Sequence, residues 1–334
     1  MTDALIELRN VSRSYLDAGA GFARPRRVVA VEDVTAAVFP GDVLGIVGES
    51  GCGKSTLIRM MLRLVWPEGG RVCWRNTDVT MLRESRLRPL RRHVQAVFQD
   101  PAGSLDPRMT VAQSLAEPLG IHEPGLRSDE RAERVAGMLA AVGLDRSLLI
   151  RYPHMLSGGQ CQRVAIARAM IIRPQVLICD EAVSALDVSI QAQIVALLTE
   201  LARTSGVAIV FVSHNLAVVR QLCTRVMVMF RGRLVETAPA EALFSAPRHP
   251  YTRALLAATP VTDPERQRHR LVQLASAGET GAEVEPSGGG CSYLPRCPMA
   301  SAGCRGMKPP LQDVGVRHAV ACWNVDVHAP AGSG

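Results

Sequence analysis

Short apolar runs rich in β-branched residues alternate along this chain with longer segments of helical periodicity. The pattern predicts strands over residues 4–8, 28–39, 43–47, 176–179 and 207–212. It predicts helices over residues 55–64, 128–142, 160–172 and 189–203. Strands that alternate with helices are typical of a parallel sheet, so the expected fold class is α/β.

Proline and glycine interrupt this pattern and divide the chain. Residues 101–107 and 118–124 each lie between two prolines and are predicted to be loops. After residue 258 the sequence becomes more polar, and residues 286–290 indicate a flexible linker. We therefore predict a main domain over residues 1–258 and a smaller C-terminal extension over residues 259–334.

The composition restricts the class of protein. The 334 residues are 47% hydrophobic and 21% charged, which excludes a chain that is disordered or fibrous throughout. No stretch reaches 18 consecutive apolar residues, and the N-terminus lacks a basic segment followed by an apolar one. The expectation is a soluble chain that faces the cytosol.

The net charge of +7 is concentrated in residues 22–92. The densest part of this region contains five arginines, Arg83, Arg86, Arg88, Arg91 and Arg92. Such a run can bind nucleic acid or anionic lipid, but a short charged run is more often a solvated face, which is the interpretation favoured here. Only two lysines, Lys54 and Lys308, occur in the chain.

Lys54 lies in a phosphate-binding motif. Residues 48–55 (Gly-Glu-Ser-Gly-Cys-Gly-Lys-Ser) fit the pattern G-x-x-x-x-G-K-[ST] between a predicted strand and a predicted helix. The glycines let backbone N–H groups curve around a phosphate, while Lys54 is expected to reach the β- and γ-phosphates and Ser55 to bind Mg²⁺. A glycine-rich turn without a ligand is the disfavoured alternative. The expected nucleotide-binding residues here are Gly48, Ser50, Gly51, Gly53, Lys54, Ser55 and Thr56.

Two acidic residues and a histidine follow the next two predicted strands. Asp180 ends an apolar run and is placed to contact the metal, and Glu181 is placed to deprotonate the attacking water. His214 follows the neighbouring strand and is expected to contact the γ-phosphate. The alternatives are solvated carboxylates at a strand end and a histidine that caps a helix or turn.

A second anion-binding motif lies at residues 156–160 (Leu-Ser-Gly-Gly-Gln). Ser157, Gly159 and Gln160 precede a predicted helix, whose N-terminus attracts negative charge. One nucleotide cannot obviously occupy both motifs within one chain. A head-to-tail dimer solves this problem, because this loop then covers the nucleotide of the other chain.

Together these motifs resemble the ATPase subunits of ABC transporters over residues 4–258. Residues 48–55 match the Walker A loop, 156–160 the family signature, and 176–181 the Walker B strand with the catalytic glutamate. The resemblance implies a P-loop, RecA-like parallel sheet with an antiparallel β subdomain and a helical subdomain over about residues 101–170. It also implies ATP and Mg²⁺ as the ligands.

The same resemblance implies further site residues. Tyr15 matches the aromatic residue that stacks on adenine, Gln99 the Q-loop glutamine, Asp187 the D-loop aspartate, and His214 the switch histidine. Ser55, Gln99 and Asp180 are then the Mg²⁺ contacts, and Glu181, His214 and Gln99 the catalytic residues. Two positions depart from the family pattern: Ala182 replaces a common proline, and Asn215 replaces a common aspartate.

The segment 248–256, with His249-Pro250-Tyr251, looks like the C-terminal hallmark of dipeptide and oligopeptide importer ATPases. This resemblance implies a peripheral subunit on the cytoplasmic face of the membrane. It implies a heterodimer with a sister ATPase, docked on two permeases that a solute-binding protein supplies. Nickel and glutathione importers share these features, and an ordinary helix start with Pro250 in its first turn is the structural alternative.

Four of the nine cysteines lie close together near the C-terminus. Cys291, Cys297, Cys304 and Cys322 have spacings that lack the short C-x2–4-C pairs common in zinc sites. In a reducing compartment metal binding is favoured over disulfides. The stretch resembles the cysteine-rich tail of several peptide importer ATPases, where a [4Fe–4S] cluster is implied; zinc or no metal are the alternatives. The five remaining cysteines are expected to be small buried or loop residues.

Two other functions compete with transport. An ABC ATPase of DNA repair or translation normally carries paired cassettes or large insertions, whereas this chain has one cassette and no sizeable insertion. A redox-sensing regulator would use the cysteine tail as its functional part. The His-Pro-Tyr segment serves neither alternative, so we expect no nucleic-acid partner.

Overall fold

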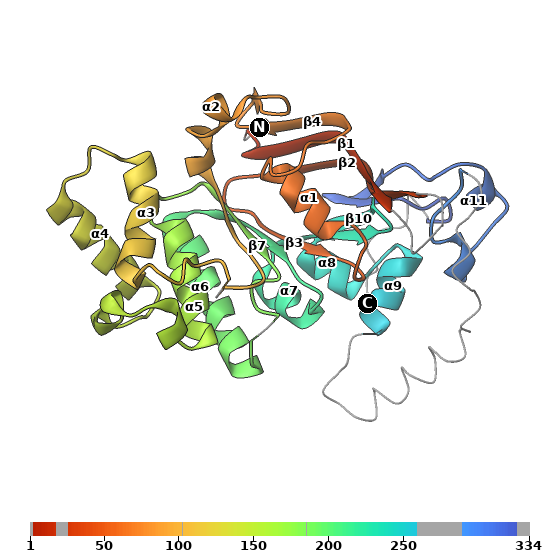
Figure 1. The fold of residues 1–334 in the computed structure, drawn as a ribbon. Helices are drawn as coiled ribbons and strands as arrows, with labels where there is room; N and C mark the ends of the chain where they lie inside the picture. Colours follow the sequence, from red (N-terminus) through yellow and green to blue (C-terminus); the bar gives the residue numbers. More distant parts are fainter. Residues whose placement is uncertain (1–2, 18–25, 102, 185, 259–288, 326–334) are drawn as a thin grey trace.

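The computed structural model describes residues 3–17, 26–101, 103–184, 186–258 and 289–325. Two sheets organise these residues (Figure 1). The main sheet has eight strands in the order β11-β12-β10-β9-β3-β8-β7-β6, and the smaller sheet has four in the order β2-β1-β4-β5. The α/β fold class is therefore confirmed.

Five parallel strands form the centre of the main sheet. β3 pairs in parallel with β8 and β9, and β7 pairs in parallel with β6 and β8. All residues of β3, β7 and β8 are buried, which explains their uninterrupted apolar sequences. The bounds are β6 Val94–Val97, β7 Val176–Asp180, β8 Ala208–Val212, β3 Val43–Val47, β9 Arg225–Phe230, β10 Arg233–Pro239, β12 His318–Val320 and β11 Gln312–Gly315.

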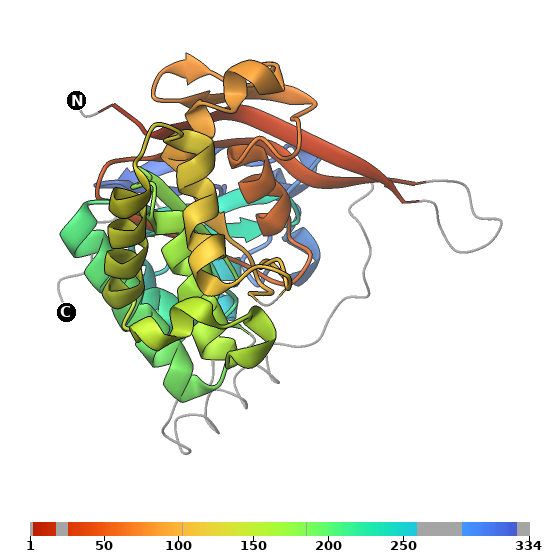
Figure 2. The same ribbon diagram turned by 60° about the vertical axis from the view of Figure 1, so that its left-hand side comes forward.

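The smaller sheet is antiparallel and lies beside helix α1 (Lys54–Met61). Its long hairpin extends away from the body of the molecule in Figure 2. Its strands are β1 Ile6–Asp17, β2 Arg26–Val38, β4 Gly69–Trp74 and β5 Thr77–Asp78. β1 is longer than the predicted strand over 4–8, β2 corresponds to the predicted strand over 28–39, and the register between them shifts between Leu8 and Ser14.

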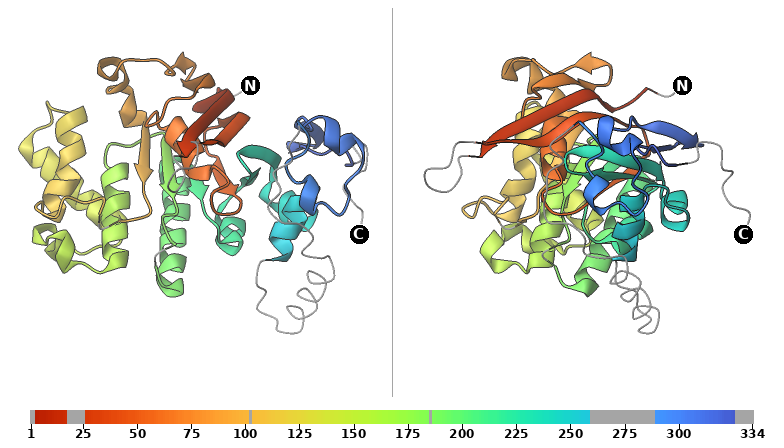
Figure 3. Two further views of the ribbon diagram at one scale, coloured as in Figure 1. Left: turned by 45° about the vertical axis from the view of Figure 1, so that its right-hand side comes forward. Right: turned by 90° about the vertical axis from the view of Figure 1, so that its right-hand side faces the viewer.

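Helices form one end of the molecule, with α3 and α4 farthest from the C-terminal residues in both Figure 1 and Figure 3. The prediction of a loop over residues 118–124 was wrong, because α3 continues through Pro118 to His122. A capping box between Thr110 and Gln113 starts this helix, and its apolar face is buried by Val111, Leu115 and Leu119. Burial of that face outweighs the hydrogen bond that proline removes.

Besides α1, most described helices lie in the connections between strands of the main sheet. Their bounds are α2 Glu84–Leu87, α3 Val111–His122, α4 Ser128–Ala141, α5 Gly158–Met170, α6 Val188–Ser205, α7 Leu216–Leu222, α8 Ala240–Ser245, α9 Pro250–Ala257 and α11 Gly303–Gly306. Single 3₁₀ turns occupy Leu90–His93, Arg146–Ile150, Pro153–Met155 and Leu294–Arg296. The predicted helices over 128–142, 160–172 and 189–203 correspond to α4, α5 and α6.

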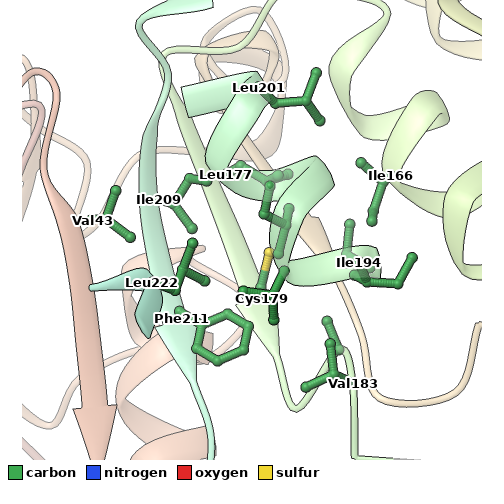
Figure 4. Close-up of a cluster of buried hydrophobic side chains, with 14 of the residues drawn as sticks. Val43, Ile166, Leu177, Cys179, Val183, Ile194, Leu201, Ile209, Phe211 and Leu222 are labelled. Atoms are coloured by element: carbon green, nitrogen blue, oxygen red, sulfur yellow. The ribbon is translucent and has the colours of Figure 1, made fainter. Parts of the chain in front are cut away.

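A large apolar core lies between the main sheet and its helices. Figure 4 shows Leu177 and Cys179 of β7 and Ile209 and Phe211 of β8 packed toward side chains of α5, α6 and α7. Phe211 is completely buried. This packing holds the carboxyl ends of β7 and β8 in place, where the predicted catalytic residues follow.

The C-terminal residues are built onto the main sheet. β12 pairs antiparallel with β10, so residues 312–320 extend the sheet that begins in the main domain. Lys308 forms an ion pair with Glu32 of β2. Hydrogen bonds from Arg233 and, to a lesser degree, from Lys308 lower the pKa of Glu32 to about 2. The division at residue 258 stays a prediction. Most of the predicted linker, residues 286–288, lies outside the described residues.

Candidate functional site

The phosphate loop joins β3 to α1 and has a backbone that only glycine permits at its tightest points. Gly53 has φ +104°, and a Cβ atom there would lie 2.0 Å from the Ala30 carbonyl oxygen. A Cβ atom on Gly48 would lie 2.2 Å from the Met229 carbonyl oxygen. The loop therefore packs directly against the backbone of β2 and β9, which fixes its shape.

Lys54 folds back into this loop. Its ammonium donates to the carbonyl oxygens of Gly48 (2.9 Å) and Glu49 (2.8 Å), and the side chain is only 5% exposed. Within the described residues it forms no ion pair with a carboxylate. A buried ammonium with neutral partners alone is electrostatically suited to a phosphate.

Asp180 lies at the end of β7 on the same edge of the sheet. One carboxylate oxygen, Oδ1, is buried and has no hydrogen-bond partner among the described residues. Burial and the neighbouring Glu181 raise the pKa of Asp180, while Arg59 and Lys54 oppose this shift. A buried oxygen without a partner fits a hard cation such as Mg²⁺, and the hydroxyl-bearing Ser55 lies in the first turn of α1.

Glu181 and His214 lie beside each other at neighbouring strand ends. The Glu181 N–H donates to the Val212 carbonyl oxygen at 3.0 Å, which ties the end of β7 to β8. His214 Nδ1 lies 3.7 Å from Glu181 Oε1, and the histidine is largely exposed. Glu181 has φ +48°, a left-handed conformation that is costly for a residue with a side chain and is often found at functional sites.

The two departures from the family pattern are explained locally. Ala182 is buried in the main core, where its small side chain fits. Asn215 caps α7, since its Oδ1 accepts from the N–H groups of Ala217 (3.1 Å) and Val218 (3.4 Å). Asparagine and aspartate serve equally as N-caps, so this substitution keeps the structure that follows His214.

Gln99 follows β6 and is exposed. Because Val97 is in register with Cys179 of β7, the chain after β6 and the chain after β7 leave the same edge of the sheet. The structure thus brings Gln99 to the edge that carries Asp180 and Glu181. Asp187, the N-cap residue of α6, is also exposed. Ala185 of the same D-loop motif lies outside the described residues.

The residues of the signature motif start α5. Ser157 and Gln160 form a capping box, in which Ser157 Oγ accepts from the Gln160 N–H and Gln160 Oε1 accepts from the Ser157 N–H. Gly159 allows α5 to approach α6, because a Cβ atom would lie 2.8 Å from Ile190. Ser157 and Gly158 are exposed, and no hydrogen bond joins them to the phosphate loop within the described part of this chain.

Tyr15 lies on β1 and is 39% exposed. The Arg13 guanidinium covers one face of its ring, 5.1 Å from the ring centroid. No described contact joins Tyr15 to the phosphate loop, so its role in adenine stacking stays a prediction.

The comparisons with known proteins agree with this geometry. Residues 31–184 match the ABC transporter family, and residues 235–304 match the C-terminal region of oligopeptide/dipeptide transporters. A probable peptide ABC transporter ATP-binding protein of Sinorhizobium fredii is 47% identical over 99% of this chain and 92% of its own length. The oligopeptide transport ATP-binding protein OppF of Salmonella typhimurium is 45% identical over 90% of each chain.

This chain belongs to the ABC transporter ATPases. A dimeric ATP-binding cassette in a post-hydrolysis state, bound to ADP and Pi, superposes with a TM-score of 0.63 at 30% identity, covering 70% of this chain and 98% of that one. ATP hydrolysis is thus the activity of this ABC ATPase. Among its described helices, none combines the length and the apolar character needed to cross a bilayer.

The His-Pro-Tyr segment of the ATPase forms the start of α9. His249 caps the helix, since its Nδ1 accepts from the Tyr251 N–H at 3.0 Å, and Pro250 occupies the first turn. The completely buried Glu236 of β10 accepts from the backbone N–H groups of Arg248 and His249. The segment therefore forms a helix start, which is the structural alternative given for it from the sequence.

Sequence reasoning missed two residues that contact this region. Glu236 binds His318 Nε2 of β12 at 2.7 Å, which links the C-terminal residues to α9. Glu49, the second residue of the phosphate loop, donates its N–H to the Tyr251 hydroxyl at 2.9 Å. Both contacts join residues more than 80 positions apart, and no local pattern reveals such a pairing.

The four C-terminal cysteines face a common small cavity, which is also lined by Tyr293 and Trp323. Burial raises the thiol pKa of Cys291, Cys297 and Cys322, and neighbouring cysteines of the set raise it further. The described residues contain no group of three or more His, Cys, Asp or Glu side chains arranged around a single metal ion. This arrangement supports neither a zinc site nor an iron–sulfur cluster, so the cluster stays a prediction from the sequence. The other five cysteines are buried, as expected.

We expect the stability of the ATPase to fall in mildly acidic solution, in part through His249. Burial lowers the pKa of His249 to about 4 against 6.5 for an ordinary histidine. Between these values the unfolded chain binds a proton that the folded chain does not, so stability decreases as the pH falls. The histidine should account for about 2 kcal/mol of the loss between pH 7 and pH 5.

Urea unfolding of the wild type and of His249→Asn at both pH values checks this. Asparagine can still cap the helix but does not titrate. The free energy of unfolding of the variant should therefore depend less on pH. Equal slopes for the two proteins would contradict the assignment.

Proposed function

We propose that this chain is the ATP-hydrolysing subunit of an ABC importer that moves dipeptides or oligopeptides across the cytoplasmic membrane. The main support for this function is the match of residues 235–304 to the C-terminal region of oligopeptide/dipeptide transporters. The names of the two relatives point the same way. Nickel or glutathione import is the alternative within the same class of transporter.

The importer needs a second ATPase chain, with which this chain forms a heterodimer. Support comes from the signature motif, whose exposed Ser157 and Gly158 face away from the interior of this chain. In the dimer, Lys54, Gln99 and His214 of this chain contact the γ-phosphate of one ATP. The corresponding signature residues of the sister chain close over it, and Ser157, Gly159 and Gln160 close over the nucleotide of the sister.

Glu181 acts as the general base for the attacking water. Its carboxylate follows a buried strand end and lies 3.7 Å from the ring of His214, which supports this role. Asp180, Ser55 and Gln99 would hold Mg²⁺, which would supply positive charge to the bound phosphates. The buried, unpartnered Oδ1 of Asp180 supports this assignment. Hydrolysis removes the γ-phosphate contacts between the two chains, and the interface loosens.

The helical region over residues 101–170 faces two permeases at the membrane, and a solute-binding protein supplies them from the other side. Three large apolar side chains support a protein contact there, since Ile121, Ile150 and Met155 are 46%, 77% and 50% exposed. The division into residues 1–258 and 259–334 is part of the same proposal. The chain then lies on the cytoplasmic face of the membrane as a peripheral subunit.

A nucleic-acid function has less support. Two arginines of the basic segment already have acidic partners, because Arg91 pairs with Glu84 and Arg92 with Glu123. A tight, salt-sensitive association with DNA or RNA would favour that alternative.

We further propose that Cys291, Cys297, Cys304 and Cys322 hold a [4Fe–4S] cluster. Their convergence on one cavity supports four thiolate ligands from separate turns. A cubane cluster holds its ligands farther apart than a single metal ion does, which suits four cysteines at uneven spacing. A redox-sensing function of this tail is a weaker alternative, because the motifs of ATP hydrolysis are complete.

Growth tests examine the transported solute. Cells that lack this chain, and that require an amino acid, should fail to grow on di- or tripeptides containing it yet grow on the free amino acid. Restoring the chain should restore growth. If peptide uptake stayed normal while glutathione or nickel uptake was lost, the peptide assignment would be wrong.

Replacing Glu181 by Gln should leave ATP binding intact and slow hydrolysis about 10²- to 10⁴-fold, because the general base is lost. Phosphate release by the assembled transporter and binding of a fluorescent ATP analogue give the two readouts. Glu200→Gln, an exposed carboxylate on α6, is the matched control and should hydrolyse ATP normally. Near-normal turnover of Glu181→Gln would remove the glutamate from this role.

Protein purified without oxygen should contain about four iron and four sulfide ions per chain. Cys297→Ser should lose most of both, while Cys73→Ser, which alters a buried cysteine of the smaller sheet, should retain them. Iron and sulfide analysis, with zinc measured in parallel, provides the readout. Zinc at one ion per chain without iron or sulfide would exclude the cluster.

A further inference from the structure

Three groups of Glu49 in the phosphate loop make contacts: its carbonyl oxygen, its backbone N–H and its carboxylate. Its carbonyl oxygen accepts from Lys54 Nζ at 2.8 Å and from the Cys52 N–H at 3.3 Å. Its N–H donates to the Tyr251 hydroxyl at 2.9 Å. Its carboxylate lies 3.5 Å from the Arg296 guanidinium. The contacts of the carbonyl oxygen are internal to the loop, while the other two come from α9 and from the 3₁₀ turn Leu294–Arg296.

Tyr251 is rigidly placed for this contact. Its side chain is 1% exposed, and its ring packs against Phe230 of β9 with centroids 4.5 Å apart and against Tyr293 at 5.5 Å. Its backbone N–H is bound by His249, which Glu236 anchors to β10. Burial raises the pKa of Tyr251, so the side chain is a neutral hydroxyl at physiological pH. The oxygen therefore has one orientation toward the loop.

The cysteine-containing segment completes the support. Tyr293 lies two residues after Cys291, is 6% exposed and contacts both Phe230 and Tyr251 edge-on. Arg296, the residue before Cys297, forms the ion pair with Glu49. Both members of that pair are about half exposed, so it is worth little by itself. The buried hydroxyl contact is the stronger of the two.

We propose that Tyr251 is a positioning residue of the ATPase, whose hydroxyl holds the first turn of the phosphate loop in the conformation that binds nucleotide. The residue touches neither phosphate nor metal and acts through the Glu49 backbone. Without the hydroxyl, the Glu49 N–H loses its partner and the loop gains alternative conformations. A smaller fraction of the molecules then has a loop conformation that binds nucleotide, so the apparent affinity for nucleotide falls. This inference rests on ATP binding at the loop, and not on the identity of the transported solute.

Tyr251→Phe tests the proposal because it removes only the hydroxyl. The KM for ATP of the assembled transporter, and the Kd of the isolated full-length chain for a fluorescent ATP analogue, should rise about five- to tenfold. The kcat should change less than twofold, since no group in contact with the reacting atoms is altered. Amide hydrogen exchange at Glu49 should become faster.

Tyr293→Phe is the matched control, since it removes a hydroxyl from the adjoining ring. That hydroxyl makes no hydrogen bond to the phosphate loop among the described residues. Its KM and its exchange at Glu49 should equal those of the wild type, and thermal unfolding should show that both variants are folded. The proposal is overturned if Tyr251→Phe keeps the wild-type KM, if both variants raise it equally, or if kcat falls at constant KM. If the wild-type transporter binds ATP normally but does not take up peptides, the proposed substrate is wrong and this inference stays intact.

Discussion

The structure depends on keeping two opposite charges buried near each other without a direct contact. Lys54 is bound only by neutral acceptors, and Asp180 has a buried oxygen that no described group satisfies. Unsatisfied buried charge costs free energy, and the raised pKa of Asp180 reports that cost. A metal–nucleotide complex supplies what each group lacks, anionic phosphate to the lysine and a cation to the aspartate. The same arrangement that destabilises the folded chain therefore provides the driving force for binding.

The rest of the fold serves to maintain this arrangement. Parallel pairing of β3, β7 and β8 brings their carboxyl ends to one edge, and the apolar core behind them prevents those ends from separating. Direct packing of Gly48 and Gly53 against neighbouring backbone leaves the phosphate loop little freedom. A polar site of this kind requires a rigid scaffold, because its groups must keep their positions while the nucleotide binds.

The parts of the structure that could be predicted are those encoded locally. β3, β7 and β8 have continuous apolar sequences, and the phosphate loop has a fixed spacing, so both were recognised from a few consecutive residues. The continuation of α3 through Pro118 could not be predicted, because burial of its apolar face outweighs the tendency of proline to end a helix. Pairing of β12 with β10 was also hidden, since a three-residue strand has no pattern until its neighbour is known. The contact between Tyr251 and Glu49 joins positions about 200 residues apart and leaves no trace in either local sequence.

The His-Pro-Tyr segment shows why a structural and a functional interpretation of one motif need not compete. His249 must stay neutral to cap α9, and burial ensures this by lowering its pKa to about 4. Pro250 supplies the backbone angle of a first helical turn. These two residues fix the direction in which the next side chain leaves the helix, and that side chain reaches the phosphate loop. Helix geometry alone explains His249 and Pro250. Together they position the Tyr251 hydroxyl beside the phosphate loop. Residues that stabilise the start of α9 thereby also fix a contact to the phosphate loop about 200 positions away.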